Sequence, residues 1–116
     1  MPHAISHIEF QVRNVQEAMQ WYADLFGWDT DYDEATNYGT FKTQASNSLD
    51  GGFNLITEHP VGTVAYVKTD DLQALLQKAQ EMGARLVQDA TVVPGKGTYA
   101  LISDPDGNAI GLWQEG

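Results

Sequence analysis

The two halves of this chain follow the same order of sequence patterns. Each half opens with a strand-like segment, continues with an amphipathic helical segment and ends with three short strand-like segments. An offset of 57 residues aligns the first strands and helices, placing Val64 on His7 and Leu76 on Met19. An Asp-Gly pair precedes the last strand of each half, at positions 50–51 and 106–107. A repeat with only two copies indicates a duplicated β-α-β-β-β unit rather than a solenoid. The alternative is a coincidence between two α+β halves. It would require the order of the elements, the helix caps and the apolar positions of the helices to match by chance.

We therefore predict an α+β fold and one domain over residues 1–116, which is a usual domain length. The first module covers about residues 1–58 and the second about 59–116. In the first module, alternation predicts a half-buried strand over 5–12. Asn14, with Glu17 three residues on, predicts the start of a helix that ends at Gly27. Three short strands are expected over 28–35, 38–44 and 51–57, the last after an Asp50-Gly51 hairpin turn.

The second module is predicted in the same way. A strand over 62–69 leads into a helix with Asp70 as its cap and Gly83 as its end, followed by strands over 84–93, 97–103 and 108–114. The apolar stripe along each predicted helix is expected to pack into the core. The aromatic residues on or beside the stripe of the first helix are expected to do the same. These core residues are Val15, Ala18, Met19, Trp21, Tyr22, Phe26, Leu72, Leu75, Leu76 and Ala79. The acidic run over 29–35 is typical of a solvated edge strand.

Composition excludes several classes of function. The net charge of −10 at pH 7 argues against nucleic acid and against anionic membrane surfaces, since both need a basic face. The absence of cysteine excludes disulfides, thiolate nucleophiles and Cys-based metal sites. No apolar run approaches 18 residues, and the N-terminus has no signal-peptide pattern, so we expect a cytoplasmic protein.

Two segments carry a family resemblance. They are "SHIEFQVRNVQEAMQWYADLFGW" near the start and "ALISDPDGNAIGLWQ" near the end. With the repeat between them, the chain resembles the vicinal oxygen chelate superfamily of glyoxalases, bleomycin-resistance proteins and extradiol dioxygenases. The resemblance implies that two modules form an open, barrel-like cleft, and it implies a homodimer. In the family's metal enzymes, a divalent ion lies in that cleft.

The resemblance also implies where metal ligands would stand. The four positions fall on His7, Asn54, Val64 and Gly111. Only the first offers a strong ligand, whereas a catalytic zinc needs about three His or carboxylate ligands. We therefore expect neither a family-type metal nor another cofactor, although Glu9 and His59 could be recruited to a divalent ion near His7.

The expected ligand-binding cleft follows from the same alignment. Alternation puts Glu9 and Gln11 on the face of His7, and the offset adds the equivalent residues of the second module. The predicted lining is His7, Glu9, Gln11, Asn54, Val64, Tyr66, Lys68, Gly111 and Trp113. Gly111 would leave space, and Trp113 would supply a stacking surface for a flat or apolar molecule.

Three hypotheses for function remain open. The first is a metal-free protein that binds a small, partly apolar or aromatic molecule. The second is an enzyme, either a glyoxalase-like lyase or isomerase or a dioxygenase-type enzyme, that uses an altered metal site or a His7–Glu9 acid–base pair. The third is a subunit that acts through dimer or partner contacts.

Overall fold

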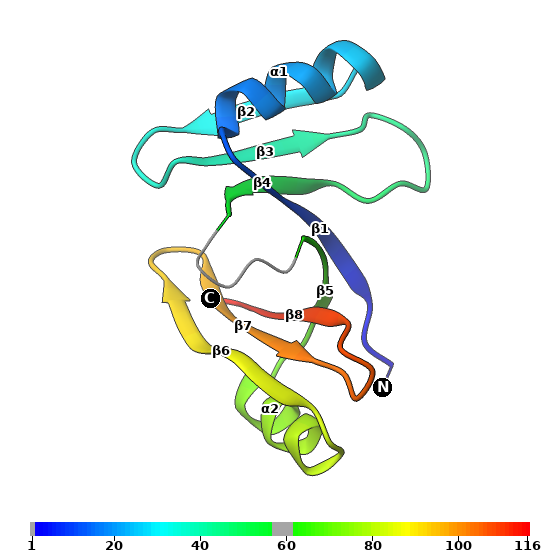
Figure 1. The fold of residues 1–116 in the computed structure, drawn as a ribbon, viewed down its shortest axis with the longest axis vertical. Helices are drawn as coiled ribbons and strands as arrows, with labels where there is room; N and C mark the ends of the chain where they lie inside the picture. The colour runs from blue at the N-terminus through cyan, green and yellow to red at the C-terminus, as the bar shows by residue number, and fades with distance from the viewer. Residues whose placement is uncertain (1, 57–61) are drawn as a thin grey trace. The chain divides into compact units, whose positions relative to one another are not determined.

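A computed structural model describes residues 2–56 and 62–116. The elements are β1 (Ile5–Val12), α1 (Val15–Phe26), β2 (Asp29–Asp33), β3 (Tyr38–Lys42), β4 (Gly51–Leu55), β5 (Thr63–Lys68), α2 (Leu72–Glu81), β6 (Arg85–Val93), β7 (Gly97–Ser103) and β8 (Ala109–Glu115). They form two compact units (Figure 1). The N-terminal unit is His7–Thr63, and the C-terminal unit joins Val64–Gly116 to the segment that ends at Ser6. The predicted division near residue 58 falls outside the described residues.

The two units have the same topology, which confirms the predicted β-α-β-β-β order. Strand order in the N-terminal unit is β2-β3-β4-β1, and in the C-terminal unit it is β6-β7-β8-β5. The first and last strands of each unit pair in parallel, β1 with β4 and β5 with β8. The remaining pairs are antiparallel, and the acidic strand β2 lies at the edge as predicted.

The core of the N-terminal unit lies between α1 and its sheet. Val15 and Met19 from the helix meet Phe41 and Phe53 from the strands, and all four side chains are buried. The ring of Phe10 stacks on both phenylalanines at centroid distances of 5.9 Å. Removing a buried ring of this kind typically costs about 3–5 kcal/mol of folding free energy, so this face is fixed by packing.

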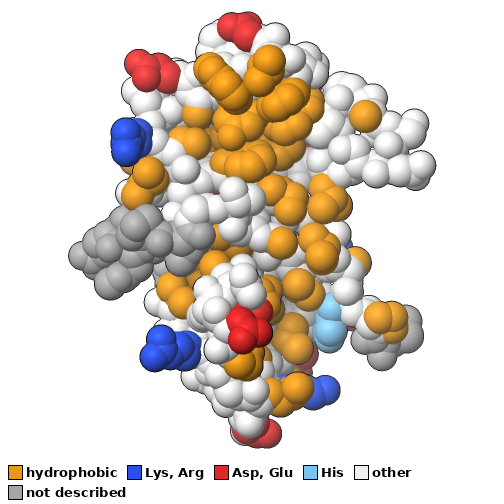
Figure 2. All heavy atoms as spheres, turned by 45° about the vertical axis from the view of Figure 1, so that its right-hand side comes forward, with side chains coloured by type: hydrophobic (Ala, Val, Ile, Leu, Met, Phe, Trp, Pro, Cys, Tyr) orange, Lys and Arg blue, Asp and Glu red, His pale blue; other side chains and the backbone are white. Residues whose placement is uncertain are grey.

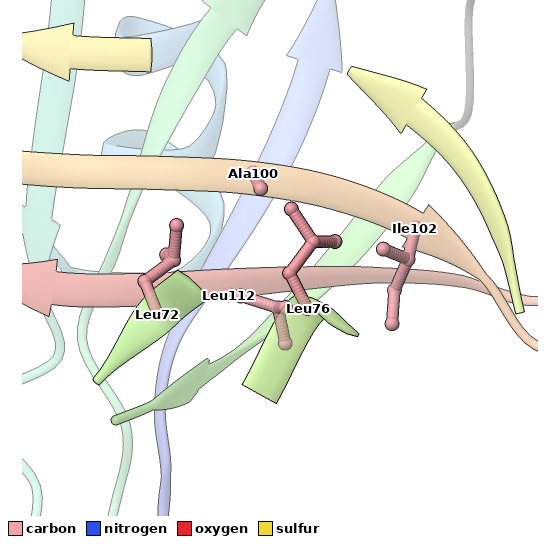
Figure 3. Packing of buried hydrophobic residues seen from close by; sticks show 5 residues of the cluster. All are labelled: Leu72, Leu76, Ala100, Ile102 and Leu112. Carbon is pink, nitrogen blue, oxygen red and sulfur yellow. The ribbon is translucent and has the colours of Figure 1, made fainter. Parts of the chain in front are cut away.

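The C-terminal unit has a separate aliphatic core. Leu72 and Leu76 of α2 pack against Ala100, Ile102 and Leu112 of β7 and β8 (Figure 3). The predicted stripe of α2 is thus confirmed, with the remaining stripe residues packed at the margin of the cluster. Because each helix covers one face of its own sheet, the residues that alternate with the core must lie on the opposite face.

Two details of the sequence prediction are wrong. The cap of α2 is Asp71, whose side chain accepts a hydrogen bond from the Ala74 N–H at 3.1 Å, and not Asp70. The Asp50-Gly51 pair does not form a hairpin turn, because Gly51 is already the first residue of β4. A Cβ at Gly51 would overlap the carbonyl oxygen of Ile8, so glycine here permits a close approach of backbones.

The aromatic end of α1 also differs from the prediction. Tyr22 packs at the core, but Trp21 and Phe26 are 57% and 53% exposed. Figure 2 shows hydrophobic side chains gathered on the surface around this helix. The reason is geometric, since a helix on a sheet buries about one third of its circumference and the aromatic residues occupy a wider arc. None of the helices in the described ranges is long and apolar enough to span a membrane.

Candidate functional site

The predicted site residues of the N-terminal unit share the sheet face opposite α1. The parallel pairing aligns Glu9 with Gly52 and Gln11 with Asn54. Their neighbours Phe10 and Phe53 point into the core beneath the helix. Alternation therefore places the polar side chains of β1 on the other face, as the sequence predicted.

A hydrogen-bonded group of three side chains occupies this face. The Tyr38 hydroxyl donates to Oε1 of Glu9 at 3.1 Å, and His7 Nε2 lies 3.0 Å from the same hydroxyl. A phenol has one proton to donate, so with that proton directed at Glu9 the Nε2–H of His7 donates to the tyrosine oxygen.

Gly52 makes this arrangement possible. Gly52 belongs to β4 and is the register partner of Glu9 on β1. A Cβ built on Gly52 would overlap the hydroxyl and ring of Tyr38. The Tyr38 side chain therefore crosses directly over the backbone of β4 to reach Glu9. Sequence reasoning missed both residues. The Gly51-Gly52 pair inside a strand was the available signal, because a glycine in a strand often marks a close approach.

Burial shapes the electrostatics of the group. Desolvation lowers the pKa of His7 below its ordinary value of 6.5, and the negative charge of Asp50 opposes that shift less strongly. The Glu9 side chain is also buried, with 7% of the residue exposed. The site thus combines an imidazole that is neutral at pH 7 with a phenol and a buried carboxyl group, which is a set suited to hydrogen bonding or proton transfer.

The other two polar residues of the predicted site in this unit, Gln11 and Asn54, each accept a hydrogen bond from a backbone N–H. Gln11 accepts a hydrogen bond from the Gly62 N–H at 3.2 Å. The amide oxygen of Asn54 accepts one from the adjacent Leu55 N–H at 3.0 Å. His59, the other candidate ligand, lies outside the described residues.

The predicted residues of the C-terminal unit share the face opposite α2. Val64 and Tyr66 are buried there, and Lys68 forms an ion pair with Glu115 at 3.0 Å. Register places Tyr66 beside Gly111 and Lys68 beside Trp113. One expectation is corrected. The space above Gly111 is filled, because a Cβ there would overlap the ring of Tyr66.

Aromatic side chains extend this face across β7. Tyr99 pairs with Trp113 in the sheet, and its hydroxyl accepts a hydrogen bond from Gln88 Nε2 at 2.8 Å. The Trp113 ring lies over Gly97, where a Cβ would come within 2.8 Å of it. The sequence prediction did not include Tyr99, although its alternation with the core residue Ala100 indicates this face.

The donor set does not fit the family's metal. Of the four positions, Val64 is an aliphatic residue and Gly111 lies under a tyrosine ring. Among the residues that the structure describes, no three His, Cys, Asp or Glu side chains gather as a metal centre would require.

Two linked β-α-β-β-β units, each with a helix on one sheet face, define a class of paired-module α+β proteins. Comparison with known families places the chain within that class. The profile of the Glyoxalase/Bleomycin resistance protein/Dioxygenase superfamily matches residues 4–112, and the chain belongs to this superfamily.

Individual proteins are similar to the chain in sequence or in fold. The chain is 28% identical over 116 residues to the candidate glyoxylase CFP32 of Mycobacterium bovis, covering 92% of this chain but 44% of that protein. A superfamily member from Vibrio splendidus matches with a TM-score of 0.67 and 15% identity, over 98% of this chain and all of that one. A structure described as an NAD-dependent benzaldehyde dehydrogenase from Legionella pneumophila gives a TM-score of 0.73 at 15% identity, over 99% and 100% of the two chains. At such identities the structural matches show the fold alone.

Proposed function

We propose that this protein binds a small, partly apolar or aromatic molecule without a family-type metal. The observation that carries the proposal is the Tyr66 ring over Gly111, at a position where the resemblance to metal enzymes implies a ligand. The ring carbons of Tyr66 occupy the space into which a metal-binding side chain at position 111 would project. Trp113 and Tyr99 lie on the same sheet face, and small-molecule sites are typically lined by such residues with a few polar groups.

The N-terminal unit carries a polar group of its own that supports the proposal, the hydrogen-bonded His7, Tyr38 and Glu9. A neutral imidazole and a phenol can exchange hydrogen bonds with a carbonyl, hydroxyl or amide of a ligand. Mycobacterial CFP32 is named as a candidate glyoxylase, but this chain spans less than half of its length. We therefore propose binding of a small carbonyl-bearing or aromatic compound and not a specific glyoxalase reaction.

A small-molecule screen by thermal shift tests the proposal. Compounds that raise the melting temperature are then measured by calorimetry on the wild type and on Trp113→Ala. If ring stacking contributes, the variant loses roughly 0.5–1.5 kcal/mol of binding free energy. Val92→Ala serves as the control, because Val92 is 70% exposed and lies on the edge strand β6. Equal binding by all three proteins would contradict the proposal.

A second candidate function, metal-free proton transfer, is favoured by the hydrogen-bonded geometry of His7, Tyr38 and Glu9. In such a step the neutral imidazole takes a proton from carbon next to a carbonyl group, and the bonding electron pair moves to the carbonyl oxygen. The assay is exchange of that proton for deuterium in D2O, followed by mass spectrometry. Exchange that is lost in His7→Gln would support this function, and a rate equal to the buffer rate would exclude it for the compounds tested.

The proposal retains a homodimer and a cytoplasmic location, both of which stay predictions. Sedimentation at micromolar concentration distinguishes one chain from two. A mass equal to a single chain across that range would contradict the dimer.

A further inference from the structure

The aromatic face of the C-terminal unit, on the side opposite α2, ends in a polar network on β6. Tyr99 and Trp113 are register partners on β7 and β8, and both are half-buried. On its other side Trp113 is the register partner of Lys68 on β5. Neighbouring strands lie about 4.8 Å apart, so a planar group that rests on Trp113 is within reach of side chains on both flanking strands.

The hydrogen bonds of the network on β6 determine which groups donate. The Thr91 hydroxyl donates to the Asp89 carbonyl oxygen at 2.9 Å, so the oxygen of that hydroxyl is left to accept. The group 3.2 Å from it is the side-chain amide of Gln88, which must therefore present its NH2 and not its carbonyl. The same NH2 donates to the Tyr99 hydroxyl at 2.8 Å. Gln88 is thus a donor toward Tyr99.

This direction fixes what the Tyr99 hydroxyl offers to a ligand. A phenol has one proton to donate, and its oxygen accepts through lone pairs. Because Gln88 donates to that oxygen from one side, the phenolic proton is directed away from Gln88. Gln88 belongs to β6, whereas Trp113 belongs to β8 on the other flank of β7. Tyr99 is therefore a hydrogen-bond donor on the side of the face that carries the indole.

The charges on the other side of Trp113 cancel each other. Lys68 Nζ lies 3.0 Å from Glu115 Oε1, and the two side chains are 44% and 66% exposed. A carboxylate ligand would compete with Glu115 for the ammonium group, and a cationic ligand would compete with Lys68 for the carboxylate. A neutral ligand leaves the ion pair intact. The face thus combines an aromatic surface with a directed donor and no uncompensated charge beside the indole.

We propose that Tyr99 selects the ligand, and that the ligand is a neutral planar molecule with a hydrogen-bond acceptor. The ring of the ligand stacks on Trp113, and the acceptor, such as the oxygen of an aryl ketone, accepts the proton of Tyr99. Gln88 is a positioning residue, because its NH2 keeps that proton directed toward the ligand. The inference rests on the proposed small-molecule binding, which it narrows to molecules that are both planar and acceptor-bearing.

The test uses two probes of the same shape. Acetophenone has a carbonyl oxygen where α-methylstyrene has a CH2 group. Dissociation constants are measured by ligand-observed NMR with each probe up to about 1 mM, the weak end of specific binding. Tyr99→Phe should weaken acetophenone binding about 2- to 10-fold, the effect of one net hydrogen bond, and should leave α-methylstyrene binding unchanged. Because each probe is compared with itself, the different hydrophobicity of the two probes cancels.

Gln88→Glu tests the positioning role separately. A carboxylate in place of the amide accepts the proton of Tyr99, so this variant should also weaken acetophenone binding and spare α-methylstyrene. A merely structural loss would weaken both probes alike. Tyr32→Phe is the matched control, because it removes a hydroxyl that donates to Asn37 in the N-terminal unit. Far-UV circular dichroism confirms that each variant is folded.

Three results would overturn the proposal. If acetophenone binds the wild type and Tyr99→Phe equally while Trp113→Ala weakens both probes, small-molecule binding on this face stands but selection by Tyr99 does not. If benzoate, titrated in the same way, binds more tightly than acetophenone, the ligand is an anion. If the wild type binds neither neutral probe, the proposed binding function fails for this face together with the inference.

Discussion

The Tyr38 hydroxyl lies directly over the backbone of Gly52, and from there it joins His7 to Glu9. Replacing Gly52 with Ala forces the ring away, and both hydrogen bonds are lost. We expect the free energy of unfolding to fall by about 1–3 kcal/mol, the usual range for overpacking. Urea denaturation measures it, and Gly116→Ala is the control because a Cβ there makes ordinary contacts.

A double variant makes the same prediction sharper. In Gly52→Ala/Tyr38→Ala the steric clash disappears, so its cost should be smaller than the sum of the two single variants by about 0.5–3 kcal/mol. Additive effects would show that the two positions do not interact.

The pH dependence of stability should carry a contribution from His7. Because burial lowers its pKa in the folded protein below 6.5, the unfolded chain binds the proton more tightly. The contribution of His7 to the free energy of unfolding is fully present above pH 6.5, the pKa in the unfolded chain. This contribution is lost as the pH falls from 6.5 through the lower pKa that His7 has in the folded protein. The free energy of unfolding between pH 7.5 and 5 should therefore depend less on pH in His7→Gln. An NMR titration that places the His7 pKa at or above 6.5 would contradict this.

Gly111→Leu should displace Tyr66 instead of filling an open space. We expect a loss of about 1–3 kcal/mol in stability together with loss of ligand binding. The loss of stability should shrink when Tyr66→Ala is added, because the added side chain then takes the place of the ring. Binding that survives Gly111→Leu would place the ligand elsewhere.

Asp70 and Asp71, at the start of α2, allow a matched test of the helix cap. Asp71→Ala removes the side chain that accepts from the Ala74 N–H, and should cost about 0.5–2 kcal/mol. Asp70→Ala changes the charge equally but removes an exposed residue outside that bond, and should cost much less. Thermal unfolding of both variants decides the assignment, and equal losses would refute it.

Elemental analysis tests the expected absence of a metal. Because Val64 and Gly111 offer no donor, the purified protein should contain far less than one zinc, nickel, manganese or iron per chain. About one equivalent of any of them would overturn the metal-free proposal.

The sequence predicted the fold well because local patterns specify it. Alternation in 5–12 and the Asn14 cap are short-range signals, and the structure reproduces both. The site depends on register, which is a long-range property. The Gly51-Gly52 pair signals a close approach, but no local pattern indicates that Tyr38 crosses β4 there to reach Glu9, or that Tyr66 covers Gly111. The cap at Asp71 instead of Asp70 and the exposed Trp21 show a second limit of sequence prediction. Adjacent residues of similar type are distinguished only by the contacts that they make in the folded protein.

The segment that ends at Ser6 belongs to the C-terminal unit, which affects how the chain can be cut into fragments. The Ala4 carbonyl accepts a hydrogen bond from the Lys68 N–H at 2.9 Å, and His3 Nδ1 lies 3.1 Å from the Lys68 carbonyl oxygen. The C-terminal unit therefore includes a segment that is synthesised before any other part of it. A chain cut between its two halves would leave β5 without this neighbour, so the fragments should recover the native sheet only when they are mixed. The two units share one pattern, but the C-terminal unit is complete only with residues from the start of the chain.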